Sequence, residues 1–337
     1  GGGCRATNYI AFLRKALADA GYAQVPVVSL NFAGMEKNPG FKLSAKLLLG
    51  LGHAVAFGDL LQQVTLRTRP YEVEPGSADA LCDKWLMRLM GILSGDEKLS
   101  WGQAARAIVA DFDNLPIHED QVKPRVGLVG EILVKFHPQA NNDAIGVIES
   151  EGGEAVMPGL MGFLFYCVYN SRFKTEHLGF PKIDWVGGRL AIWFLERLRK
   201  STVDALKASK RFDPPARIEE LAQGAETVLS TGNCTGEGWF LTAEMIELIQ
   251  SGVPNIICAQ PFACLPNHVT GKGMIKRLRK LYPLANVVPV DYDPGASEVN
   301  QLNRIKLMVA TAFRNLEGAS PETEAGQEVA QRDPVSA

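Results

Sequence analysis

The sequence predicts an α/β protein with two Rossmann- or flavodoxin-like domains and parallel sheets, the first domain being truncated and helix-rich. Three observations carry this prediction. After residue 124, short apolar strand patterns alternate with helical ones, which is typical of a parallel, doubly wound sheet. Helical patterns dominate from about residue 43 to residue 109. Between the two parts lies the polar segment Leu115–Pro124, whose two prolines indicate a hinge.

The composition excludes several protein classes. Of the 337 residues, 46% are hydrophobic and 21% are charged, which excludes a disordered chain, a collagen and a disulfide miniprotein. The formal net charge of −2 predicts no recruitment of nucleic acid or of an anionic membrane. The apolar stretch Met157–Val168 is too short to span a bilayer, and the sequence shows no signal segment. We therefore expect a cytoplasmic protein.

The first residues resemble the interior of a longer chain. A glycine-rich turn, Gly1–Cys4, leads into an amphipathic helix pattern without an initiator Met. Such a turn normally follows a strand, and the next strand is expected at Val25–Asn31, after a helix stop at Gly21. These features predict a carboxy-terminal piece of a longer polypeptide.

The remaining elements are expected in order along the chain. Residues 1–118 are assigned to the first domain, residues 119–316 to the second, and residues 317–337 to a disordered, acid-rich tail. About a hundred residues separate the second and third strands of the second domain, so helices at about 184–230 are expected to form an insertion. The predicted helices cover residues 42–56, 60–66, 78–93, 101–111, 143–151, 189–208, 218–229, 239–250, 272–281 and 297–315, and the predicted strands 125–136, 154–157, 255–260 and 287–291.

Six sparse cysteines indicate reduced thiols instead of a disulfide framework. Cys264 lies between two prolines at the end of a predicted strand, where it is either a metal or cluster ligand or a small buried hydrophobe. Cys4 opens a helix beside Arg5, so it is either a ligand or nucleophile of lowered pKa or an accidental cysteine. Cys82, Cys167 and Cys258 follow apolar patterns and are expected in the core.

Cys234 is a weaker metal-ligand candidate in the glycine-rich loop Ser230–Gly238. Such a loop can cradle a phosphate or a carboxylate with its amides, but a plain connection into a helix is the favoured interpretation. Asp291 and Asp293 end a strand and are candidates for binding a ribose or a metal, although Asp-Pro-Gly more often forms a turn.

Several familiar motifs are missing from the sequence. Gly271-Lys272-Gly273 lacks the upstream glycine and the hydroxyl residue of a phosphate-binding P-loop, and no G-x-G-x-x-G follows a strand. The sequence also has no H-E-x-x-H and no C-x-x-C pair. Binding of ATP, NAD or a closed structural zinc by this chain is therefore not expected.

Several long motifs resemble one family. The chain resembles the carboxy-terminal region of the large proteins related to activators of 2-hydroxyacyl-CoA dehydratase (acyl-CoA dehydratase activase-related proteins), over nearly its whole length to about residue 315. The stretches that carry the resemblance are Gly3–Tyr9, Gly127–Phe136, Gly236–Thr242, Gln260–His268, Gly271–Gly273, Asp291–Gly295 and Asn300–Met308.

The resemblance implies an oxygen-sensitive iron–sulfur system of anaerobic metabolism with a dehydratase-subunit fold. In it, α/β domains hold a four-iron four-sulfur cluster between them by cysteines from separate loops. Cys264 corresponds to the cysteine of the last domain and Cys4 to one in the preceding domain, so the two are expected to face one another across the interdomain cleft. Further ligands would lie upstream, which leaves the cluster incomplete or absent in this piece.

Two functions follow as hypotheses. The first is a 2-hydroxyacyl-CoA dehydratase-like enzyme or ATP-dependent reductase component that passes low-potential electrons to acyl-CoA or to another substrate. The second is a non-catalytic scaffold or docking domain for the activase ATPase domains or a partner reductase. The expected partners are activase domains of the same or another chain, with acyl-CoA and a second copy of this chain as further candidates. No catalytic residue is assigned.

Overall fold

The computed structural model describes residues 8–28, 44–293, 295 and 297–318. The chain divides into two compact units, Gly1–Gly52 and His53–Ala337. The first contains α1 (Tyr9–Asp19) and the start of α2 (Ala45–Thr68). Gly21 ends α1 as predicted, with φ at +84° and its N–H donating to the Ala18 carbonyl. The described part of the predicted strand at 25–31, residues 25–28, is not a strand.

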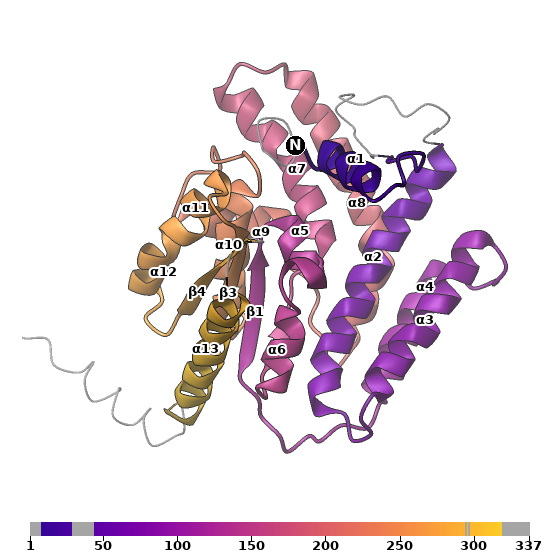
Figure 1. Ribbon diagram of the computed structural model, residues 1–337. Coiled ribbons are helices and arrows are strands. Elements are labelled where there is room, and N and C mark those ends of the chain that lie inside the picture. Colours follow the sequence, from indigo (N-terminus) through magenta and orange to yellow (C-terminus); the bar gives the residue numbers. More distant parts are fainter. Residues whose placement is uncertain (1–7, 29–43, 294, 296, 319–337) are drawn as a thin grey trace, which may run out of the picture. The chain divides into compact units, whose positions relative to one another are not determined.

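The second unit is built on a parallel sheet. Its strands are β1 (Arg125–Gly130), β2 (Glu154–Val156), β3 (Asn255–Pro261) and β4 (Asn286–Tyr292), in the order β2-β1-β3-β4. Figure 1 shows β1, β3 and β4 side by side. Every neighbouring pair is parallel. The predicted α/β class with a parallel sheet is therefore confirmed, and this is the single sheet that the described residues form.

The strand order creates a switch point between β1 and β3. The chain leaves β1 for β2 on one side and later returns to β3 on the other side of β1. In open parallel sheets, ligands bind outside the carboxyl ends of the strands at such a point. The strands are parallel, so the loops after β1, β3 and β4 leave the sheet at the same edge, as predicted.

The first strand is shorter than the predicted one, which ran to Phe136. It ends at Gly130, and α5 (Ile132–Phe136) follows. A Cβ at Gly130, whose φ is +148°, would lie 1.8 Å from the Ala259 carbonyl oxygen. The Glu131 side chain then accepts a hydrogen bond from Val134 N at 2.9 Å and caps the new helix. The apolar sequence continues beyond Gly130, but Ile132–Phe136 form a helix because the Glu131 carboxylate caps its amino terminus.

Helices cover both faces of the sheet. On one face, α6 (Ala144–Ser150) and α13 (Glu298–Gly318) pack against alternate strand residues, and on the other face α10 (Gly238–Gln250) and α12 (Ile275–Leu281) do so. The first core includes Val126, Leu128, Ile257, Val290, Ile148, Ile305, Met308 and Val309, and the second includes Val129, Ile256, Cys258, Val287, Leu241, Met245, Ile246 and Leu278.

A third core joins α2, α3 (Ser77–Ser94), α4 (Trp101–Asp113), α7 (Leu160–His177), α8 (Lys182–Lys207), α9 (Ile218–Glu226) and the start of α10. The two helices predicted at 42–56 and 60–66 form the single helix α2, because Gly58 is accommodated inside it. The apolar run from Met157 was not predicted as a helix, but most of it lies in α7. Outside this core lie α11 (Leu265–Thr270) and the short 3-10 turns Arg69–Tyr71, Pro138–Ala140 and Lys272–Met274.

The segment Ala45–Tyr71 is long and apolar enough to cross a membrane by length and composition alone. Core helices pass the same test, and Phe57, Leu60 and Val64 of this segment are buried in the third core. The cytoplasmic location stays a prediction. So does the domain boundary at residues 118 and 119, although residues 53–118 belong to the same compact unit as the sheet.

Candidate functional site at the carboxyl edge of the sheet

Three loops meet where β1 and β3 end. The Glu237 side chain, which follows the Cys234 loop, accepts a hydrogen bond from Ile132 N after β1 at 3.3 Å. With its amide oriented to satisfy both atoms, Asn267 donates to Glu237 Oε2 at 2.8 Å and accepts from Glu131 N at 3.2 Å. These bonds tie the loops after β1 and β3 to the start of α10. We call Glu131, Glu237, Asn267 and Cys264 the carboxyl-edge site.

Cys264 lies at this edge, as the sequence predicts. It is buried, with 9% of its surface exposed, and occupies the N-cap of α11 after β3. Its N–H donates to the Pro261 carbonyl at 3.1 Å, and its carbonyl accepts from His268 N at 2.9 Å. Ala263, the residue before it, has φ at +56°, a conformation that L-residues rarely adopt. The loop is thus held in one shape, and a ligand role for the thiol stays a prediction.

The Cys234 loop lies against the Cys264 segment. A Cβ at Gly236 would come within 2.8 Å of the Pro266 ring. The amides of Gly232, Asn233 and Cys234 donate to oxygen atoms of the loop itself, at Ser230 and Gly232. These amides are therefore not available to cradle a phosphate, and the favoured interpretation of a plain connection fits the geometry.

The other cysteines are distributed as follows. Cys258 is fully buried in β3, and burial raises the pKa of its thiol to about 12. This agrees with the core prediction. Cys82 is half-buried on α3, and Cys167 is exposed on α7, so the core prediction is wrong for Cys167. Helical spacing alone did not show which side of α7 faces the core. Cys4 lies outside the described residues, and its predicted approach to Cys264 stays a prediction.

Glu131 and Glu237 form a pair of buried carboxyl groups that the sequence did not predict. Burial, and then the nearby charge of Glu131, raise the pKa of Glu237 to about 7. Burial also raises the pKa of Glu131, against the hydrogen bonds from Val134 and Leu133. The site therefore holds a proton near neutral pH. Glu237 stands inside the glycine-flanked run Gly236-Glu-Gly238, but nothing local signals that Glu131 lies beside it.

Beside this pair, Asp291 connects three of the motifs that carry the family resemblance. Gln260 Nε2 donates to Asp291 Oδ1 at 2.7 Å, and Lys272 Nζ lies 3.2 Å from Oδ2. His268 Nε2 lies 3.9 Å from Oδ1. Burial alone would raise the pKa of Asp291, but the bonds from Gln260 and Lys272 hold it below its usual range. Asp291 is thus engaged within the fold, whereas Asp293 is exposed.

The fit of an iron–sulfur cluster to this edge is partial. A four-iron four-sulfur cluster takes four cysteine thiolates. The loops that carry Cys264 and Cys234 lie against each other at this edge, and no group of three or more His, Cys, Asp or Glu side chains among the described residues could hold a metal ion. The described residues by themselves therefore do not complete a cluster site. The chain matches no family model, no curated protein and no solved structure.

Proposed function

We propose that this chain is an iron–sulfur redox component related to 2-hydroxyacyl-CoA dehydratase and its ATP-dependent activase. In this proposal Cys264 contributes one thiolate to a four-iron four-sulfur cluster that passes low-potential electrons to a substrate. Activase domains would supply the electron, and acyl-CoA is the substrate class that the resemblance suggests.

One observation supports the proposal most strongly. Cys264 is buried on a constrained loop at the carboxyl end of β3, beside the switch point of the parallel sheet. That is where open α/β sheets bind their ligands. The remaining ligands would include Cys4, from the proposed first Rossmann-like domain at residues 1–118, and on weaker grounds Cys234.

The test is anaerobic reconstitution of the natural full-length polypeptide with iron and sulfide. We expect Cys264→Ser and Cys4→Ser to lower bound iron, acid-labile sulfide and visible absorbance. Cys82→Ser is the matched control, because Cys82 lies on α3, which packs against α4 and the turn Arg69–Tyr71 and not against the loops of the site. Full cluster content in both serine variants, with unchanged circular dichroism, would show the assignment to be wrong.

A second candidate, a non-catalytic docking domain, is favoured by the surface of α8. Four large apolar side chains at helical spacing, Ile183, Val186, Leu190 and Trp193, are each 58% to 70% exposed. Exposed apolar patches of this kind often mark protein contacts. A colourless full-length protein that binds purified activase domains, and loses them on Trp193→Glu, would support this function over the first.

A further inference from the structure

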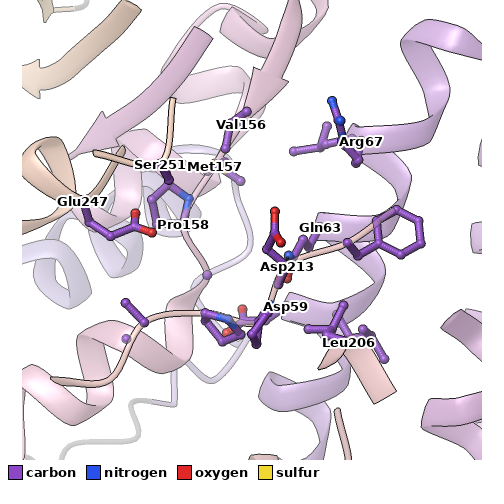
Figure 2. A pocket seen from close by; sticks show the side chains of 18 of the residues that line it. Asp59, Gln63, Arg67, Val156, Met157, Pro158, Leu206, Asp213, Glu247 and Ser251 are labelled. Carbon is purple, nitrogen blue, oxygen red and sulfur yellow. Dashed lines mark hydrogen bonds between the residues drawn. The ribbon is translucent and has the colours of Figure 1, made fainter. Parts of the chain in front are cut away.

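A cavity of about 210 Å³ lies beside β2, apart from the carboxyl-edge site (Figure 2). It is partly open to solvent and is lined by the end of β2, by α2, α7, α8 and α10, and by the segment 211–216. None of its lining residues belongs to the loops that hold Cys264 or Cys234. The cavity is therefore a separate candidate site.

Much of the cavity wall is apolar. Leu206 of α8, Phe212 after it and Phe240 of α10 are buried side chains that line it. Met157 and Pro158 close the side beside β2. A cavity of about 150 Å³ is known to hold benzene, so this one has room for an aromatic ring and a short substituent.

Two of the cationic groups on the wall share one carboxylate. Arg125 Nε lies 2.9 Å from Glu154 Oε1, and Arg67 is paired with Glu154 Oε2. The Tyr71 hydroxyl also donates to Oε2, at 2.8 Å. Arg125 has a further long hydrogen bond to the Ser251 carbonyl, at 3.4 Å. Both guanidinium groups are therefore engaged by the protein.

The other two cationic groups are engaged as well. Arg199 binds both carboxylate oxygens of Glu196, at 3.0 and 2.6 Å. Arg211 Nη1 donates to the carbonyl oxygen of Phe112 at 2.7 Å and has a longer contact with that of Leu115 at 3.4 Å. Each guanidinium group on the wall thus already has an oxygen partner within the protein.

Most acids on the wall also have partners. Asp59 accepts the N–H groups of Leu160 and Met161, both at 2.8 Å, at the start of α7. Glu244 is paired with Lys135 at 2.8 Å. The carboxylates of Asp59 and Glu244 therefore already have partners within the protein.

Glu247 and Asp213 differ from the other acids. Within the described residues, their carboxyl groups form no hydrogen bond and no ion pair. Figure 2 shows both side chains at the cavity, Glu247 projecting from α10 and Asp213 from the segment after α8. Glu247 is half-buried, and burial, with a smaller effect of Glu244 and against that of Arg125, raises its pKa to about 7. The unpartnered charges of the cavity are thus both acidic.

We propose that this cavity binds a small organic amine, whose ammonium group pairs with Glu247 and whose apolar body packs against Leu206, Phe212 and Phe240. The carboxylate of Asp213, which also lines the cavity, attracts the same ammonium group. Partial burial of the Glu247 carboxylate without a partner disfavours its charged form, and a ligand ammonium supplies the missing charge and hydrogen bonds. An anionic ligand of the same size would meet guanidinium groups that already have partners and carboxylates that repel it.

The test compares three probes of one shape with the intact chain: benzylamine, benzyl alcohol and benzoate. Titration calorimetry at pH 8 should show benzylamine binding at least tenfold more tightly than benzyl alcohol, and no binding of benzoate. Glu247→Gln should weaken benzylamine binding about tenfold and leave benzyl alcohol binding unchanged. Glu74→Gln, at an exposed acid outside the cavity, is the control.

Three results would overturn the proposal. They are preferred binding of benzoate, unchanged benzylamine binding by Glu247→Gln, and no binding of any probe at millimolar concentration. As a second variant, Glu247→Lys places an ammonium group in the cavity and should exclude benzylamine. Reconstituted iron content should not respond to either change at Glu247, and benzylamine binding should not respond to Cys264→Ser, so this site and the proposed cluster are tested separately.

Discussion

Lys135 and Glu244 form an ion pair that is buried between α5 and α10, with Nζ 2.8 Å from Oε1. Both side chains are almost completely excluded from solvent. Burial raises the pKa of Glu244, and the charge of Lys135 opposes that effect. The pair fastens the short helix after β1 to the helix that follows the Cys234 loop, and it therefore helps to hold the carboxyl-edge site together.

Removing one partner of this pair should destabilise the protein strongly. We expect Lys135→Met to lower the free energy of unfolding by about 3–5 kcal/mol, because it leaves Glu244 buried without a counter-charge. The double variant Lys135→Met, Glu244→Leu should recover most of this loss. Denaturant unfolding of the three proteins measures both effects, and a single variant as stable as the native chain contradicts the prediction.

Glu237 should make stability depend on pH. Its pKa is about 7 in the folded protein, above the usual value of 4.5. A carboxyl group of raised pKa binds more protons when folded, so its contribution is fully present below about pH 4.5 and is lost as the pH rises through 7. The free energy of unfolding of the native protein should fall between pH 5 and 7. In the Glu237→Gln variant this fall should be smaller by a few kcal/mol. An identical pH profile for variant and native protein contradicts the prediction.

Replacing Gly130 and replacing Gly58 by alanine should change the stability of the protein in opposite directions. Gly130→Ala should destabilise the protein by several kcal/mol, since the new Cβ would lie 1.8 Å from the Ala259 carbonyl oxygen. Gly58 lies inside α2, where an added Cβ would have no atom within 4 Å. Gly58→Ala should therefore raise the free energy of unfolding by about 0.5–1 kcal/mol. Thermal unfolding distinguishes them, and equal shifts in Tm would count against the close approach of β1 and β3.

Ala263→Gly tests the shape of the Cys264 loop. Ala263 has φ at +56°, which costs a non-glycine residue about 1–2 kcal/mol. Glycine removes this cost but adds entropy to the unfolded chain, so we expect a net gain of about 1 kcal/mol or less. A clear loss of stability in denaturant unfolding would mean that the left-handed conformation is not adopted.

Much of the second unit follows from local sequence patterns. The apolar runs that form β3 and β4, and the helices α3, α4, α6, α10 and α13, were predicted within a few residues, because each carries its own periodicity and end signals. The position of Cys264 at the end of β3 was predictable for the same reason. Chain direction in a parallel sheet then places the loops after β1, β3 and β4 at one edge.

Other features were decided by the tertiary structure. The end of β1 depends on the Ala259 backbone beside Gly130, and the proximity of Glu131 to Glu237 depends on Asn267 between them. Gly130 and Ala259, like Glu131 and Glu237, lie more than a hundred residues apart in the sequence. Among the described residues Glu247 has no hydrogen-bond or ion-pair partner, and the nearby Arg125 is bound by Glu154 of β2. Local patterns determined which elements form, because backbone propensity and apolar spacing act over one or two turns. Burial and pairing of charges decided the polar sites, because these energies exist only once distant segments have excluded water together.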